Sequence, residues 1–311
     1  MAASTEVVES SARLFAGGGW LALLISNYHS GSKIEALDRA GGRRMADSGD
    51  LGGSGETGGQ RRIVLITGAS RGIGAETARV LAARSDHVVI NYREKRKRAE
   101  TLAAEIAAAG GSASVAGADI ADPDSARALI DTVIAEFGRL DVLVLNASGG
   151  LERDAAPGYA MLLNRDAQTR LVRLALPHLP EGGRIVFVTS HQAHFSPTRE
   201  VPPGYEPIAA SKRAGEDALR AMIDEFADRG IGFTVVSGDM IDGTIIVRLL
   251  ERRDPAAVTA RRDQGDLPTV EDFATAVADA TTADAEHGHT VYVGGTDFLS
   301  DKVAAPTTTH I

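Results

Sequence analysis

The segment TGASRGIG, residues 67–74, constrains the fold of this chain more than any other stretch. It joins a short β-branched run to residues 72–85, which have helical spacing. Gly68 permits a tight turn, and Gly72 and Gly74 let the backbone come close to a ligand and to the sheet. The amides at the start of the helix would then face a pyrophosphate, assisted by the helix dipole. The segment therefore predicts a dinucleotide-binding strand–loop–helix unit.

Strand and helix patterns alternate along the rest of the chain. Asp122 and Pro123 predict a helix start, and Gly110 and Gly138 predict helix ends. Such alternation produces right-handed βαβ units and a parallel sheet. We expect an α/β fold, a doubly wound, seven-stranded parallel sheet of the Rossmann type with helices on both faces. The expected strands are residues 62–67, 87–92, 112–120, 141–146, 184–190, 232–238 and 290–295, and the expected helices are residues 72–85, 94–110, 122–138, 158–179, the Lys212 helix to about Arg229, and 245–258.

Composition narrows the class of protein. The chain has 311 residues, of which 43% are hydrophobic and 24% charged, and its formal net charge is −9. The negative charge argues against nucleic acid or an anionic membrane as a partner. The absence of cysteine excludes disulfides, Cys-ligated metals and a thiol nucleophile, and it fits a reducing compartment. We expect a cytoplasmic protein without a metal site.

The first part of the chain, residues 1–60, differs from the regular part that follows. Its apolar run, residues 14–26, is shorter than the roughly 20 residues that a membrane helix needs. A Gly/Ser-rich stretch then leads to the first strand. We expect a flexible N-terminal extension over residues 1–60, with Met45 as a candidate translation start and a membrane anchor as the alternative. Residues 61–311 are expected to form a single dinucleotide-binding catalytic domain.

Three further motifs follow the glycine segment in the expected order. They are GADI at 117–120, LNASGG at 145–150 and YVGGTD at 292–297. Over about residues 61–297 the chain resembles the short-chain dehydrogenase/reductase family, whose signature is TGxxxGxG. The resemblance implies a homo-oligomer, a dimer or tetramer, assembled through the fourth and fifth helices. It also implies a cofactor site made of Gly68, Ser70, Arg71, Gly72, Ile73, Gly74, Asn91, Tyr92, Arg93, Asp119, Ile120, Asn146, Lys212 and Thr244, in which Asp119 faces the adenine and Asn146 steadies the sheet.

The choice of cofactor follows from the charge at the end of the second strand. An NAD site needs a carboxylate there for the ribose 2′-hydroxyl, and that carboxylate would repel a 2′-phosphate. Asn91, Tyr92 and Arg93 occupy the place, with no acid before Glu94. Arg93 can pair with a phosphate in a forked geometry, and Arg71 adds a second positive charge. We expect NADP(H), with NAD(H) as the alternative; either arginine can also be read as a solvated surface charge.

The resemblance implies general acid catalysis at a carbonyl or alcohol carbon. In the family a tyrosine donates the proton, a lysine lowers its pKa and holds the ribose, a serine steadies the substrate oxygen, and an asparagine completes a proton path. Asn164, Ser190 and Lys212 match three of these positions. Ser190 ends a strand, at the edge where α/β sheets bind ligands. The fourth position fails, because Ile208 stands four residues before Lys212 where the tyrosine is expected.

The identity of the proton donor is therefore open. Tyr205, seven residues before Lys212, is one candidate. His191 and His194 are others, because histidine titrates near neutral pH. Each histidine is also readily explained as a loop residue with no catalytic role.

The segment after the sixth strand also departs from the family. Asp239 follows Gly238 where the family has a Pro-Gly pair, and it either takes part in function or starts a turn. Residues 245–258 are Arg-rich and helical, and they occupy the place of the family's substrate lid.

Together these features predict an NADP(H)-dependent oxidoreductase that acts on a small-molecule carbonyl or alcohol. Its expected catalytic residues are Asn164, Ser190, Tyr205 and Lys212. One alternative is a catalytically silent NADP(H)-binding protein of the same fold that serves as a sensor or partner subunit. Another is a non-redox enzyme on this fold, since a fold does not fix chemistry.

Overall fold

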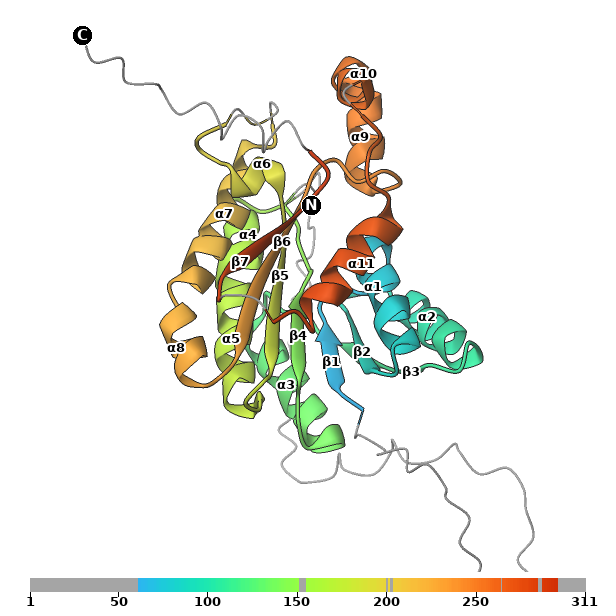
Figure 1. Cartoon of the computed structure of the whole chain (residues 1–311), viewed down its shortest axis with the longest axis vertical. Coiled ribbons are helices and arrows are strands. Elements are labelled where there is room, and N and C mark those ends of the chain that lie inside the picture. Colours follow the sequence, from blue (N-terminus) through green and yellow to red (C-terminus); the bar gives the residue numbers. More distant parts are fainter. Residues whose placement is uncertain are drawn as a thin grey trace, which may run out of the picture. The chain divides into compact units, whose positions relative to one another are not determined.

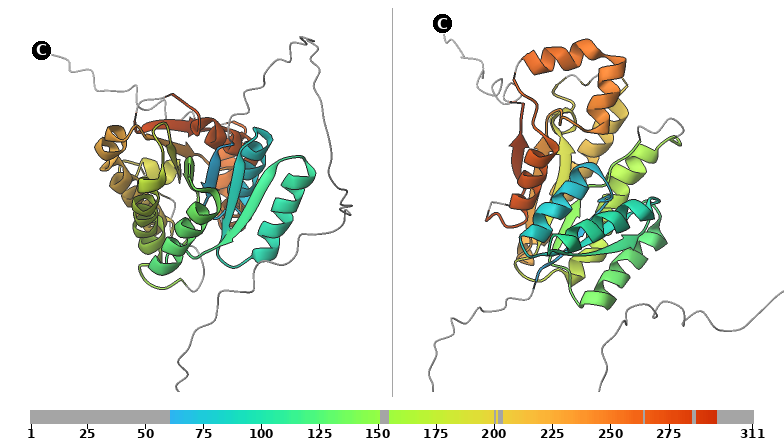
Figure 2. Two further views of the ribbon diagram at one scale, coloured as in Figure 1. Left: turned by 90° about the horizontal axis from the view of Figure 1, so that it is seen from below. Right: turned by 90° about the vertical axis from the view of Figure 1, so that its right-hand side faces the viewer.

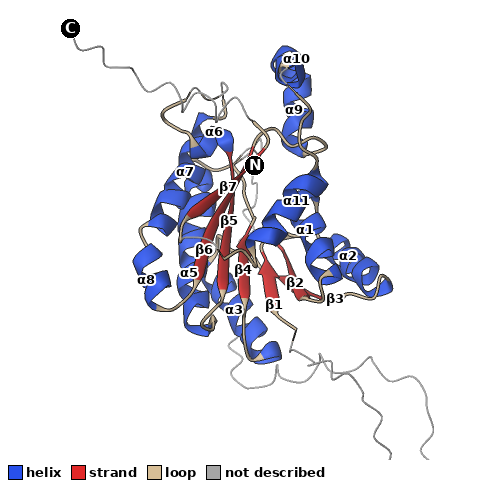
Figure 3. Cartoon of the chain, in the orientation of Figure 1, coloured by secondary structure: helices blue, strands red, loops and turns tan. Residues whose placement is uncertain are grey.

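Seven parallel strands form one sheet in the described part of the chain (Figure 3). The structure, a computed structural model, describes residues 61–150, 155–199, 201, 204–263, 265–284 and 287–295. The strand order is β3-β2-β1-β4-β5-β6-β7, which confirms the predicted doubly wound fold. The strands are β1 (Ile63–Ile66), β2 (His87–Tyr92), β3 (Ser112–Gly117), β4 (Val142–Leu145), β5 (Arg184–Ser190), β6 (Gly232–Gly238) and β7 (His289–Val293).

Helices cover both faces of this sheet (Figure 1, Figure 2). One face carries α1 (Gly72–Ala83), α2 (Arg96–Ala108) and α11 (Val270–Ala280). The other carries α3 (Pro123–Phe137), the π-helical turn η1 (Leu162–Ala167), α5 (Gln168–Ala175), α7 (Glu206–Arg220) and α8 (Ile223–Asp228). The remaining helical elements are α4 (Tyr159–Met161), η2 (Leu176–His178), α6 (His191–His194), α9 (Ile245–Arg253) and α10 (Pro255–Asp263).

Each face of the sheet has its own hydrophobic core. Leu65 of β1 packs into the core that contains α3 and α5. Val64 and Ile66, its neighbours on the strand, pack into the core that contains α1 and α2. All three are fully buried, because successive side chains of a strand point to opposite faces and both faces are covered.

The helix ends follow from local sequence. The Asp122 side chain accepts a hydrogen bond from the amide of Ser125, and Gly138 closes α3 at φ +73°. These are the ends that Asp122, Pro123 and Gly138 predicted. Helix α11 was not predicted, and it begins with a capping box between Thr269 and Asp272. Hydrogen bonds from the Thr269 amide and then its hydroxyl lower the pKa of the Asp272 carboxyl.

Three predicted helices are interrupted. The helix expected over residues 158–179 contains the π-helical turn η1 and ends in a 3₁₀ turn, η2. The helix that carries Lys212 stops at Arg220 and α8 begins only at Ile223. The helix expected over residues 245–258 breaks at Asp254, because Pro255 lacks an amide hydrogen and disfavours helical geometry in the residue before it.

The expectations for residues 1–60 fall outside the described residues, and the single domain over 61–311 stays a prediction. Within the residues that are described, no helix is both long and apolar enough to span a bilayer.

Gly215 sets the distance between α7 and η1. A β-carbon at this position would overlap the carbonyl oxygen of Asn164. The two helices can therefore lie close together only while residue 215 is glycine. This contact matters for the site, because α7 carries Lys212 and η1 carries Asn164.

We expect Gly215→Ala to destabilise the protein by about 1–3 kcal/mol, because the added methyl group overpacks this crossing. Ala210→Ser, on the exposed face of the same helix, is the matched control and should change stability by less than about 0.5 kcal/mol. Urea denaturation measures both. Equal midpoints for the two variants would show that the crossing tolerates a side chain.

Candidate functional site

The carboxyl ends of β1 and β4 are tied together by one buried hydroxyl. Thr67 Oγ1 accepts hydrogen bonds from the amides of Asn146 and Ala147, both at 3.0 Å. The Asn146 side chain donates in return to the carbonyl oxygen of Thr67 at 2.9 Å. The strand order reverses direction at β1, and α/β sheets bind ligands at such a switch point. The Asn146 amide group and side chain thus join the central strands β1 and β4.

The glycine loop starts at this junction. Gly68 has φ +63°, and a β-carbon on it would lie 3.0 Å from Ala147 Cα. A β-carbon on Gly74 would lie 2.5 Å from Asn146 Nδ2. Gly72, at φ +57°, has open space around its missing side chain and begins α1. The loop is therefore pressed against β4 on one side and leaves the amides at the start of α1 accessible.

The side chains of Asn91 and Tyr92, at the end of β2, make hydrogen bonds within the protein beside the glycine loop. Asn91 Oδ1 accepts from the Gly68 amide at 3.2 Å, and its Nδ2 donates to the carbonyl oxygens of Ala116 and Ala118. The Tyr92 hydroxyl accepts from Arg96 Nε at 3.0 Å. Both side chains are buried, so Asn91 fixes the glycine loop to β2 and β3 through its own amide group.

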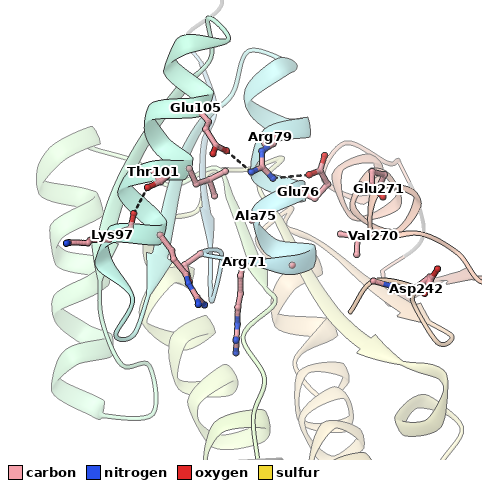
Figure 4. Close-up of a pocket in the computed structure, with 15 residues that line it drawn as sticks. Arg71, Ala75, Glu76, Arg79, Lys97, Thr101, Glu105, Asp242, Val270 and Glu271 are labelled. Carbon is pink, nitrogen blue, oxygen red and sulfur yellow. Dashed lines mark hydrogen bonds and ion pairs between the residues drawn. The ribbon is translucent and has the colours of Figure 1, made fainter. Parts of the chain in front are cut away.

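Three cations gather beside the glycine loop. Arg71, Lys97 and Arg98 line a pocket of about 600 Å³ between α1, α2 and the start of α11 (Figure 4). Within the described residues, none of these three side chains has a hydrogen-bond or ion-pair partner. Arg79 in the same pocket differs, because it is paired with Glu76 and Glu105. Unpaired cations beside a helix start are suited to an anion.

Arg93 is not among the residues that line this pocket. Its side chain pairs with Glu94, and it donates to the hydroxyl of Tyr159 at 2.5 Å. Asp119, which follows β3, accepts from the amide of Ala121 at 2.9 Å. Ile120 is buried beside it.

Asn164 connects three parts of the site. Its amide nitrogen donates to the carbonyl oxygen of Gly149 at 3.0 Å and to Ser211 Oγ at 2.9 Å. Its Oδ1 accepts from the amide of Gly149. Ser211 in turn donates to the carbonyl oxygen of Ile208. Asn164 lies in the π-helical turn η1, a type of irregularity often found at functional sites.

The polar side-chain groups of three residues have no hydrogen-bond partner in the described structure: Ser190, Tyr205 and Lys212. Ser190 Oγ, at the end of β5, is buried without a hydrogen-bond partner in the described structure. Tyr205 caps the start of α7, and Lys212 lies two turns into that helix. Both are partly buried, and within the described residues neither side chain has a polar partner. The structure thus brings three polar groups with open hydrogen-bonding capacity to β5 and the adjoining α7.

Ile208 is part of the packing rather than of the surface. It is 4% exposed. A β-carbon on Gly150 would lie 2.6 Å from Ile208 Cδ1 and 2.6 Å from Ala160 Cβ. Gly150 has φ +106°, so it is suited to this close approach of two segments. The isoleucine therefore presents an aliphatic wall on the helical face of Lys212.

Both histidines, predicted to lie in a loop, lie in the short helix α6, and both are hydrogen-bonded within the protein. His191 is fully buried, with Nε2 donating to the carbonyl oxygen of Gly294 and Nδ1 bonded to Ser237. His194 Nδ1 donates to the buried Glu216 at 2.8 Å, and its Nε2 lies 2.9 Å from the Tyr292 hydroxyl. Because both ring nitrogens of each residue have protein partners, neither histidine is placed to donate to a substrate.

Sequence reasoning missed some of these contacts. Lys97 and Arg98 were not among the predicted cofactor residues, although they lie in the first turn of α2, four and five residues after Arg93. Thr244, predicted to contact cofactor, caps α9 by accepting from the amide of Val247. No group of three or more His, Asp or Glu suited to a metal occurs among the described residues.

Known proteins resemble this chain in sequence and in fold. The model of the short chain dehydrogenase family matches residues 62–254. The versicolorin reductase stcU of Emericella nidulans is 31% identical over 211 residues, which are 66% of this chain and 78% of that protein. A short-chain dehydrogenase from Burkholderia cenocepacia J2315 in complex with NADP superposes with a TM-score of 0.64 at 32% identity, over 76% of this chain and 96% of that chain. A blue fluorescent protein from a metagenomic library, in complex with NADPH, superposes with a TM-score of 0.66 at 29% identity, over 75% of this chain and 96% of that one.

The fold and site therefore define a dinucleotide-binding α/β oxidoreductase. The chain belongs to the short-chain dehydrogenase family, whose members act on carbonyl and alcohol groups.

The engaged histidine His194 leads to a prediction. We expect His194→Ala to lower the free energy of unfolding by about 1–3 kcal/mol, because Glu216 and Tyr292 each lose a buried partner. His178→Ala, at an exposed position, is the control and should leave stability unchanged. Thermal denaturation compares the two. A large loss of turnover by His194→Ala at unchanged stability would instead identify His194 as the proton donor.

Proposed function

We propose that this protein is an NADP(H)-dependent reductase of small carbonyl compounds, with Tyr205 as a displaced proton donor. Reduction is favoured because NADPH usually supplies reducing power. The observation that carries the proposal is the buried, unpartnered Oγ of Ser190 at the end of β5. Buried hydroxyls nearly always have a partner, and a substrate oxygen would supply one here.

The cofactor assignment rests on charge. Arg71, Lys97 and Arg98 line the pocket at the glycine loop together with Arg79 and four carboxylates, and within the described residues none of these three cations is paired with a carboxylate. A 2′-phosphate would be attracted to this place, where an NAD site would have an acid. Two structures similar to this chain contain NADP or NADPH, which agrees with this choice. Arg93 would join the site only by leaving the Tyr159 hydroxyl.

The residues of this chain fit the cofactor at several points. The open space beside Gly72 leaves room for a pyrophosphate at the start of α1. Asp119 and Ile120 would border the adenine, and Lys212 the ribose of the nicotinamide. When bound, NADPH supplies the hydride that reduces the carbonyl carbon.

The remaining chemistry belongs to side chains of the protein. The Ser190 hydroxyl would donate a hydrogen bond to the carbonyl oxygen and stabilise the charge that develops there. The Tyr205 hydroxyl would donate the proton that converts this oxygen to an alcohol. Asn164 would act by holding Gly149 and Ser211, and so the start of α7, in position. Ile208 would line the cleft and exclude water.

The donor assignment predicts a specific loss. We expect Tyr205→Phe to lower kcat for NADPH-dependent carbonyl reduction by about 10²–10⁴-fold while NADPH still binds, because general acid catalysis contributes that much. Ser190→Ala should also lower kcat strongly. Glu206→Gln, next to Tyr205 and exposed, is the control. Steady-state kinetics over a panel of ketones and aldehydes measures these effects.

Two other results of these kinetic measurements would each support a different account of the site. Unchanged kcat in Tyr205→Phe together with an inactive Ser190→Ala would assign the proton to another group. If the wild-type protein binds NADPH but reduces no member of the panel, the catalytically silent sensor or partner subunit becomes the better account. The buried Ile208 in place of a proton donor is the observation that favours that second account.

Cofactor preference is tested separately. We expect Arg71→Gln and Arg98→Gln each to weaken NADPH binding by about 10- to 100-fold and to leave NADH binding unchanged, because a charged hydrogen bond contributes about 1.5–3 kcal/mol. Arg84→Gln, which removes an arginine paired with Asp279 at the other end of α1, is the control. The dissociation constants for NADPH and NADH, measured by calorimetry, test this preference. A wild-type protein that binds NADH as tightly as NADPH would overturn the assignment.

The homo-oligomer and the cytoplasmic location remain predictions that follow from resemblance and composition.

A further inference from the structure

A buried ion pair joins helix α10 to the end of β6. Asp239 Oδ2 accepts from Arg261 Nε at 2.6 Å and pairs with its Nη2 at 2.5 Å. The Asp239 side chain is 1% exposed and that of Arg261 13%. The Asp239 amide also donates to the carbonyl oxygen of Val293, so the backbone here is fixed to the end of β7.

This ion pair lies at the edge of the sheet that carries Ser190. Ser190 pairs in register with Gly238, and Asp239 is the next residue along β6. The position of α10 is therefore fixed relative to the strand ends of β5 and β6. Arg261 lies 22 residues along the chain from Asp239. The ion pair therefore joins the end of the α9–α10 segment to the residue after β6, where the segment leaves the sheet.

The helices α9 and α10 project beyond the end of the sheet (Figure 1, Figure 2). A hydrogen bond from the Asp242 amide to the carbonyl oxygen of Pro268 joins the two ends of the segment at its base. Val247 and Val258 are buried within it. The segment is thus attached to the body at its base, and the Arg261–Asp239 pair is a further attachment through side chains.

Arg262, the next residue, makes two ion pairs that are exposed rather than buried. Arg262 contacts Glu251 at 2.8 Å and Asp242 at 3.2 Å, and its side chain is 45% exposed. Exposed ion pairs contribute little to stability, whereas breaking a buried pair leaves an uncompensated charge. Movement of α10 away from the sheet would leave the Asp239 carboxylate buried and unpaired, and its Oδ1 already has no partner in the described structure. The closed position is therefore the favoured one.

We propose that Arg261 and Asp239 are the positioning pair of the substrate lid. They attach α10 to the end of β6, so that a carbonyl substrate is enclosed beside Ser190. Neither residue acts on the reacting atoms. The inference rests on the proposed function for its role in catalysis, but the attachment of the lid can be measured without any activity.

The test compares two pairs of variants. Asp239→Asn and Arg261→Gln break the buried pair between α10 and the end of β6, and Glu251→Gln and Arg262→Gln break the exposed pair between α9 and α10. The first readout is the rate of tryptic cleavage after Arg248 and Arg252 of α9, followed by mass spectrometry of the full-length protein. We expect about tenfold faster cleavage in Asp239→Asn and Arg261→Gln, and wild-type rates in the two controls.

The second readout is kinetic. We expect the KM for a carbonyl substrate to rise about ten- to hundredfold in Asp239→Asn and Arg261→Gln, with the Kd of NADPH unchanged, because substrate positioning contributes effects of this size. Arg261→Lys, which keeps the charge, should recover part of the loss. Arg261→Gln should be the more severe variant, because it leaves the carboxylate buried and unpaired.

Two results would overturn the proposal. One is equal cleavage rates in the buried-pair and exposed-pair variants. The other is a loss of NADPH binding that parallels the rise in KM, which would indicate a general structural role. If Arg261→Gln fails to fold, Asp239→Asn and Arg261→Lys carry the test. An inactive wild-type protein would contradict the proposed function alone, since the cleavage rates would still decide whether the pair holds the lid.

Discussion

The hydroxyl of Thr67 is the contact on which the rest of the site depends. It accepts from the amides of Asn146 and Ala147, and so it fixes the carboxyl end of β4 to that of β1. Without it those two amides would lose their buried acceptor. A valine of the same shape could not replace it, because only the hydroxyl serves the two amides. The glycine loop begins at the next residue and Gly74 packs on Asn146, so the placement of the glycine loop follows from this junction.

Local patterns predicted the fold because they act over short stretches of chain. Strand periodicity and the caps at Asp122 and Gly138 are encoded within a few residues, and the structure agrees with both. The interruption of the Lys212 helix after Arg220 was not predicted, since nothing in the residues there resembles a helix stop. The break at Asp254 could have been predicted from Pro255, which by itself ends a helix.

The site was predictable only in part. The places of Ser190 and Lys212 followed from motif and topology, since strand ends and the following helix meet at one edge of the sheet. The engagement of His194 could not be predicted, because its partners Glu216 and Tyr292 lie 22 and 98 residues away. Asn91 illustrates the same limit, since its amide bonds to Gly68 and to β3 depend on the register of three strands.

Ile208, which stands where the family has a tyrosine, and the buried Arg261–Asp239 ion pair would both act, under the proposed function, by excluding water. Ile208 is buried against Gly150, and Arg261 pairs with Asp239 at the end of β6. A hydrogen bond or charge acts more strongly where water is excluded, because the local dielectric constant is lower. Under the proposed function, Ser190 would then stabilise the substrate oxygen more effectively than it would in an open cleft. A proton donor held two turns from Lys212, rather than one, requires that the substrate oxygen be held in place while the proton arrives. Under the proposed function, a fixed Ser190, the aliphatic side chain of Ile208 and a lid attached by Arg261 would together meet that requirement.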